Sequence, residues 1–276
     1  MTMQRTERVG MCALVLSATL TSSPAAQQPT HAVYYSVPSW APDGGTIAFE
    51  SNRDGEAAVY TIRPDGSGLT RLTPSGTPGE QPNWSTDGRS IVFTSSRDGV
   101  RQLYLMARTG GDPVALPGTT NGFLAAFSPD GRWLLFAAQD RRPSSQYRVF
   151  VLHPDGSSRR QLGDSTKSNE DPRWTTDGQR VVFTEVPMLE RLPNEAPRDF
   201  VRRRTEAQRL FSVTPEGLDT RALQPDEANR LSRDRGLSPD GKWLVYSKEV
   251  ENVVGLYLQE QSSGAERLLD RGNPRP

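Results

Sequence analysis

The sequence predicts an all-β fold, a β-propeller of about five four-stranded blades, or six if one further copy is degenerate. One phrase recurs five times: an aromatic or apolar residue, a tight turn ending in Asp-Gly, and an apolar triplet that closes on an aromatic. The copies begin at Trp40, Trp84, Phe127, Trp174 and Leu237, which are 44, 43, 47 and 63 residues apart. A repeat of about 40–45 residues is typical of propeller blades.

Each repeat unit divides into four short apolar segments separated by turns. In the first unit these segments are residues 35–40, 46–50, 59–62 and 69–72. The turns carry Ser-Pro-Asp-Gly or a close variant, in which Pro supplies a φ near −65° and Gly supplies a positive φ. Four short antiparallel strands per unit are the expected content of one blade. Blade four closes on a gap of 28 residues between Phe183 and Phe211, against 11 between Phe49 and Tyr60.

The motif resembles a known family. Pro-x-Trp-Ser-x-Asp-Gly, an apolar-x-Phe strand, Ser-x-Arg-Asp-Gly and an Ile/Leu-Tyr strand are similar to the WD40-like PD40 repeat of TolB-like β-propellers, and residues 82–106 are close to a consensus copy. The resemblance covers roughly residues 35–270 and implies a propeller without the α/β domain that precedes it in TolB. Five copies stand where the TolB propeller has six, so ring closure of blade five on blade one stays open.

The N-terminus predicts export. Arg5 and Arg8 precede an apolar run and small residues, as in a secretory signal peptide cleaved after Ala25. We therefore expect a signal peptide at 1–25, a linker at 26–34, the propeller at 35–270 and a tail at 271–276. The expected mature chain is periplasmic or secreted, monomeric and without an integral membrane segment. Cys12 lies in the signal, which excludes disulfides and cysteine ligands from the mature chain.

Departures from the repeat are the candidate binding elements. If the first strand of each blade is innermost, the loops between second and third strands share one rim with the connections between blades. Blade four carries about 17 extra residues there, 188–205, in which Pro197 is expected to begin a short helix. Arginine forks match carboxylates, so the candidate partner-binding residues are Arg97, Arg141, Arg142, Arg198, Arg202, Arg203 and Arg204. The competing interpretation is a solvated loop.

Carboxylates give the alternative chemistry. The Asp of each Asp-Gly turn (Asp43, Asp87, Asp130, Asp177 and Asp240, the turn aspartates) is expected to bond its own turn backbone rather than a ring-bound Ca²⁺. Glu80, Glu170 and Asp171 precede inner strands and are the better metal candidates. His153 is expected to be a structural repeat position, and a histidine metal cluster is absent from the sequence. Trp40, Trp84 and Trp174 are expected in the core between blades.

Composition narrows the function. The chain has 33 basic and 33 acidic residues, which gives no reason to expect a nucleic-acid partner. It contains no Gly-x-Ser-x-Gly elbow, which argues against a serine-peptidase triad. The expected function is a non-catalytic exported module that binds a protein or an envelope component through its loop-rich rim, with no cofactor. The alternative is a small propeller enzyme of the lactonase or polysaccharide lyase type that uses channel carboxylates and Ca²⁺.

Overall fold

A computed structural model describes residues 33–139, 146–224, 227, 236–251 and 253–274. These residues form five antiparallel sheets, which are the blades expected from the repeat. Blade one contains β1 (Tyr35–Trp40), β2 (Ile47–Ser51), β3 (Ala58–Ile62) and β4 (Thr70–Arg71). Blade two contains β5 (Glu80–Trp84), β6 (Ser90–Ser95), β7 (Gln102–Ala107) and β8 (Val114–Ala115).

The remaining sheets follow the same order. Blade three contains β9 (Gly122–Phe127), β10 (Leu134–Gln139), β11 (Tyr147–Leu152) and β12 (Arg160–Leu162). Blade four contains β13 (Ser168–Trp174), β14 (Val181–Val186), β15 (Arg209–Val213) and β16 (Arg221–Leu223). Blade five contains β17 (Trp243–Val250), β18 (Val253–Glu260) and β19 (Glu266–Pro274). Its inner edge is reduced to one bridge, between Leu237 and Leu244.

The Asp-Gly turns owe their regularity to a repeated hydrogen-bond pattern. In blade two, Asp87 Oδ1 accepts bonds from the Arg89 N–H at 3.0 Å and the Ser85 hydroxyl at 2.6 Å. The other turn aspartates likewise accept the backbone N–H two residues on, from Gly45, Arg132, Gln179 and Lys242. The following glycines have positive φ, for example 67° at Gly88. The interpretation of these carboxylates as turn-building groups agrees with this geometry.

The core lies between blades. The aromatic that closes each second strand stacks on the aromatic of the third, as Phe136 does on Phe150 with centroids 5.3 Å apart. Phe49, Phe93, Phe136 and Phe183 are at most 1% exposed. Each lies in a hydrophobic cluster shared with the preceding blade in the arc, so four clusters join the five blades. The tryptophans expected in the core, Trp40, Trp84 and Trp174, lie in these clusters.

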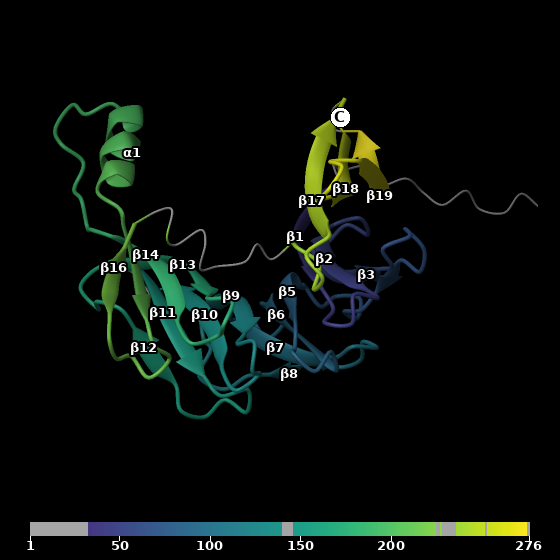
Figure 1. The fold of residues 1–276 in the computed structure, drawn as a ribbon, viewed down its shortest axis with the longest axis horizontal. Helices are drawn as coiled ribbons and strands as arrows, with labels where there is room; N and C mark the ends of the chain where they lie inside the picture. Colours follow the sequence, from purple (N-terminus) through teal and green to yellow (C-terminus); the bar gives the residue numbers. More distant parts are fainter. Residues whose placement is uncertain (1–32, 140–145, 225–226, 228–235, 252, 275–276) are drawn as a thin grey trace, which may run out of the picture.

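The blades form an arc in which blade five packs directly on blade one. Figure 1 shows the order from β17–β19 through β1–β4, β5–β8 and β9–β12 to β13–β16. Arg53 of blade one forms an ion pair with Asp270 of β19 at 2.7 Å, and the Tyr35 hydroxyl donates to the same carboxylate. Within the described residues, no hydrophobic cluster joins blade four to blade five. Those two blades are therefore the ends of the arc.

Two features concern the expected boundaries. Helix α1 (Pro197–Glu206) lies within the long connection of blade four, where the sequence predicts a helix beginning at Pro197. Strand β19 continues to Pro274, so it takes in residues 271–274, which the sequence assigns to a tail. Val33, assigned to the linker, is buried in the cluster between blades one and five. The expected signal peptide lies outside the described residues.

Candidate functional site: the arc centre and the loop-rich rim

The inner strands share a bulge that shapes the centre of the arc. Val37, Gln81, Leu124 and Asp171 each stand three residues before the anchor of their blade, and their φ values lie between 45° and 54°. The strand register shifts at this point in β1, β5 and β13. Positive φ is unfavourable for residues other than Gly, and such strain persists only where surrounding contacts hold it. The bulges are thus a built feature of the inner wall.

Side chains of one blade hold the bulge of the next. Glu50 accepts bonds from the Tyr34 hydroxyl at 2.8 Å and from the Gln81 N–H at 3.0 Å. Gln81 Oε1 in turn accepts the Leu124 N–H at 3.0 Å. Burial raises the pKa of the Glu50 carboxyl above its ordinary value, and the two hydrogen bonds oppose that shift. This chain of bonds connects blades one, two and three on the inner wall.

A pocket of about 350 Å³ opens at the centre, at the end that carries the Asp-Gly turns. All five repeat units contribute to its wall, which is largely apolar and aromatic and includes Trp40, Trp84, Phe127 and Trp174. Its polar lining consists of Ser39, Asn83, Arg173, Thr175 and Thr176. An apolar pocket with a few convergent polar groups is the usual form of a ligand site.

Arg173 is the residue of the centre that sequence reasoning missed. It lines the main pocket and also a second hollow of about 320 Å³, lined by Val37, Leu124, Asp171 and Pro172. Its Nε is buried without a hydrogen-bond partner. The signal was present in the repeat: the residue before the anchor is Ser39, Asn83, Ala126 and Gly236 in the other units, and only blade four has a long cation.

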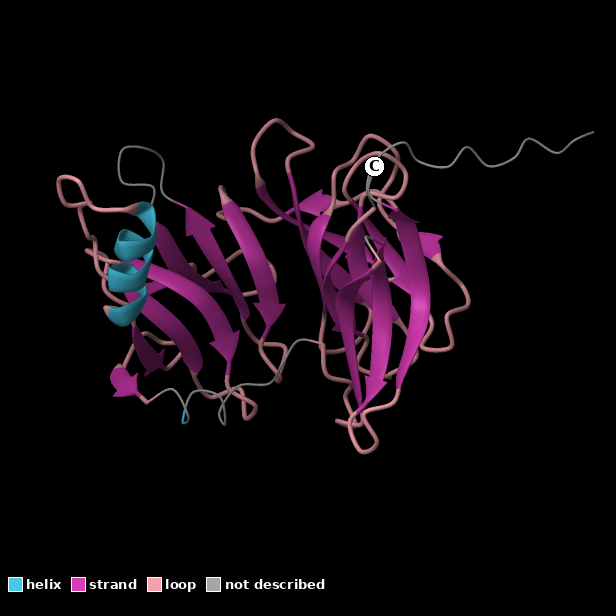
Figure 2. Cartoon of the chain, turned by 90° about the horizontal axis from the view of Figure 1, so that it is seen from above, coloured by secondary structure: helices cyan, strands magenta, loops and turns pink. Residues whose placement is uncertain are grey.

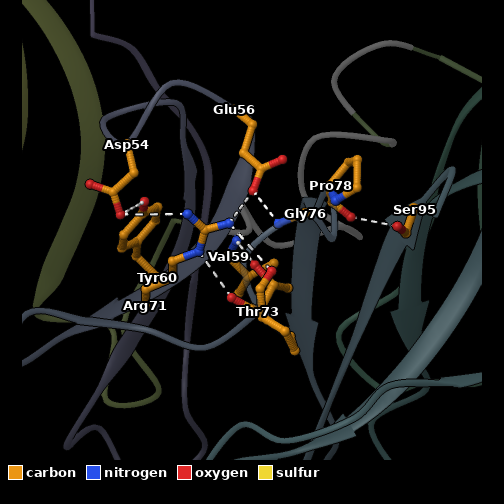
Figure 3. A network of polar contacts seen from close by, with 10 residues as sticks. Asp54, Glu56, Val59, Tyr60, Arg71, Thr73, Gly76, Pro78 and Ser95 are labelled. Atoms are coloured by element: carbon orange, nitrogen blue, oxygen red, sulfur yellow. Dashed lines mark hydrogen bonds and ion pairs between the residues drawn. The ribbon is translucent and has the colours of Figure 1, made fainter. Parts of the chain in front are cut away.

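The loop-rich rim is built from residues that bond within their own blade. In blade one, Arg71 lies between Glu56 at 2.5 Å and Asp54 at 3.6 Å, and the Tyr60 hydroxyl donates to Asp54 (Figure 3). Blade two repeats this contact, with the Tyr104 hydroxyl donating to Asp98 at 2.7 Å. The Asp of each Arg-Asp-Gly loop thus anchors the loop to the third strand.

The candidate arginines are divided between pairs and undescribed residues. Arg97 pairs with Asp112 at 2.8 Å, Arg202 with Asp199 at 3.1 Å, Arg203 with Glu195 at 2.9 Å and Arg204 with Glu170 at 2.5 Å. These contacts hold helix α1 to its loop and to β13. Arg198 lies on the same helix. Arg141 and Arg142 lie outside the described residues. The structure therefore gives the paired arginines a positioning role in the insertion.

The insertion presents apolar side chains. Met188, Leu192 and Val201 are 56%, 55% and 60% exposed, and helix α1 has no buried residue. Figure 2 shows the helix projecting beside the sheets of the left half of the arc. Beneath it, Phe200 and Arg204 line a hollow of about 190 Å³ together with Tyr147 and Glu170. The segment is thus attached at one side and exposed at the other.

The metal candidates are not brought together. Glu80 pairs with Arg101 at 2.9 Å and Glu170 with Arg204, while Asp171 lines the second hollow. In the described part of the chain, no group of three His, Cys, Asp or Glu side chains is placed to hold a metal ion. His153 stacks on Trp133 at 4.3 Å, and its Nδ1 lies 3.0 Å from the Arg132 carbonyl oxygen, as suits a structural repeat position.

Comparisons with known proteins agree with this architecture. The model of the PD40 family, the TolB beta propeller domain, matches residues 15–191. Dipeptidyl-peptidase 5 of Porphyromonas endodontalis is 27% identical over 137 residues, which are 46% of this chain and 16% of that peptidase. This chain therefore corresponds to a small part of that relative.

Two solved structures share the fold. The putative TolB from Agrobacterium tumefaciens has a TM-score of 0.54 at 17% identity, over 86% of this chain and 80% of that one. TolB from Acinetobacter baumannii has a TM-score of 0.52 at 19% identity, over 89% of this chain and 54% of that one. Among the described residues, no helix has the length and apolar character needed to cross a membrane.

Proposed function

Because this chain belongs to the TolB β-propeller domain family, we propose that it is an exported, non-catalytic interaction module that binds a protein or cell-envelope component through its loop-rich rim. The observation that carries the proposal is the blade-four insertion. It is the longest of five equivalent connections, and it exposes three of the large apolar side chains on the described surface. Loops that vary while a regular scaffold holds them are the usual place of binding residues.

The contacts of the insertion support a binding surface held in place before a partner arrives. Arg203 bonds to Glu195 and to the Glu190 carbonyl oxygen at 2.8 Å, and Arg204 connects the helix to β13. A surface fixed beforehand loses less conformational entropy on binding. Exposed Val201 and Leu192 then supply apolar area that association would bury. In this proposal the apolar residues make the contact and the arginines orient them.

The test compares binding and folding in the same variants. Deletion of residues 188–205 should leave thermal unfolding nearly unchanged, because helix α1 has no buried residue. It should also abolish pull-down of the native partner from the host envelope. Val201→Asp should weaken the same pull-down while the helix persists. Val114→Asp is the matched control, because Val114 is 69% exposed on the outer strand of blade two.

Two results would contradict the proposal. Retention of the partner by both the deletion and Val201→Asp would remove the rim from the contact. Hydrolysis or cleavage of a panel of lactones and glycans by the purified chain, with dependence on Ca²⁺, would favour the enzyme alternative instead. Export is tested separately: the intact mass of the protein recovered outside the cytoplasm should match a chain that begins at Ala26.

A further inference from the structure

We propose that Arg173 makes the centre of the arc a binding site for a carboxylate attached to an apolar or aromatic group. Four inner strands place the residue before their anchor on the wall of the central pocket: Ser39, Asn83, Ala126 and Arg173. Three of these side chains are short. The space that they leave is lined by the one long cation of the set.

The charge of Arg173 is not satisfied within the described protein. No ion pair or hydrogen bond joins its side chain to any described residue, and its Nε is buried without an acceptor. Asp171, two residues away in the chain, lines the second hollow but forms no ion pair with it. A guanidinium presents five donors in a planar fork that matches a carboxylate bidentately. An unpaired cation in an apolar pocket therefore selects an anion.

The rest of the pocket wall defines what the anion carries. Trp40, Trp84, Phe127 and Trp174 surround the space with aromatic surface, and Pro42, Pro129 and Pro239 add rigid apolar groups. Beside Arg173, the Ser39 hydroxyl and the Asn83 amide supply further donors, 3.4 Å from each other. A volume of about 350 Å³ is at the small end of ligand pockets, which suits one apolar side chain with its carboxylate.

Two sources share this chemistry, a small carboxylic acid and the C-terminal carboxylate of a peptide. The inference rests on the proposal that the chain is a binding module, but it concerns the opposite end of the arc from the insertion. The two fail separately: deletion of residues 188–205 should leave carboxylate binding intact. Loss of partner pull-down with intact acid binding would separate the rim contact from the central site.

The experiment is isothermal titration of the mature chain with four probes. Phenylacetate and the acetylated peptide Ac-Gly-Gly-Phe carry the carboxylate, and phenylacetamide and Ac-Gly-Gly-Phe-amide are their neutral counterparts. Both acids should bind and both amides should be at least about tenfold weaker, which is about 1.4 kcal/mol. Binding of phenylacetate alone identifies a small acid as the ligand. Binding of the peptide acid at equal or higher affinity identifies a peptide end.

Variants assign the effect to one residue. Arg173→Gln should weaken both acids by about tenfold or more without weakening the amides, and Arg173→Lys should be intermediate because it keeps the charge and loses the fork. Arg89→Gln, on an exposed turn of blade two, is the matched control and should change affinity by less than about twofold. Equal binding of acids and amides, or unchanged acid affinity in Arg173→Gln, would overturn the proposal. The comparison of acids with amides needs no variant and holds even if Arg173→Gln does not fold.

Discussion

Truncating the same repeat position in the middle and at the end of the arc should have very different costs. Phe136, between blades two and three, is 0% exposed, stacks on Phe150 and packs in one cluster with Val92 and Leu103. Tyr246 is its equivalent in blade five, where the described residues provide no blade against it. It is partly exposed and stacks on Tyr257, with centroids 6.3 Å apart.

The expected magnitudes follow from these surroundings. Burial of about 150–250 Å² of an aromatic residue at about 25 cal/mol per Å² is worth about 4–6 kcal/mol, and Phe→Ala substitutions in cores lose about 3–5 kcal/mol. Phe136→Ala should therefore lower the free energy of unfolding by about 3–5 kcal/mol. Tyr246→Ala loses one aromatic pair and a hydrogen bond to Glu266 at an exposed site, which together are worth about 1–2 kcal/mol.

Urea unfolding followed by tryptophan fluorescence and circular dichroism measures both variants. Phe93→Ala, buried between blades one and two, is the control and should behave as Phe136→Ala does. A loss for Tyr246→Ala as large as that for Phe136→Ala would refute the reasoning. It would mean that a further surface covers blade five in solution and that the arc is closed.

Three further predictions concern single interactions. Hydrogen bonds to Ser128 and to a backbone N–H hold the pKa of Asp130 below its ordinary 3.8, so its stabilisation is full above that pH and is lost as pH falls through the lower folded value. Acid melts should show this loss, and it should be smaller in Asp130→Asn. Arg53→Met should cost about 1–3 kcal/mol in chemical unfolding, because it leaves the half-buried Asp270 with only the Tyr35 hydroxyl; the exposed counterpart Arg97→Met should cost about 0–1 kcal/mol. Added Ca²⁺ should leave the melting temperature unchanged, since the turn aspartates already accept their own backbone N–H groups, and a saturable rise would show a metal site.

The repeat made most of the fold predictable. The anchors, the Asp-Gly turns and the closing aromatics recur at fixed spacing, and each has one physical role in every blade. The helix at Pro197 was predictable for the same reason, because it begins where the spacing departs from the repeat. The order of the blades in the arc was not, because the contact of Arg53 with Asp270 joins residues that are 217 positions apart.

The candidate sites were less accessible to sequence reasoning. The arginines of the insertion were chosen for their charge, but Arg203 and Arg204 have carboxylate partners that only the folded chain brings near. Arg173 escaped notice because its meaning depends on the short side chains at the same position in other blades. The positive φ of Val37 and Leu124 carries no sequence signal, since neither residue favours that conformation.

The central claim, a binding module whose contact surface is the blade-four insertion, is tested most directly by site-specific photocrosslinking in the native host. A photoreactive residue at position 201 should capture a defined envelope protein or component, and the same residue at position 114 should not. Capture should disappear when Leu192 is also changed to Asp. Equal capture at positions 201 and 114, or no product at position 201 in a host that contains the folded protein, would contradict the account.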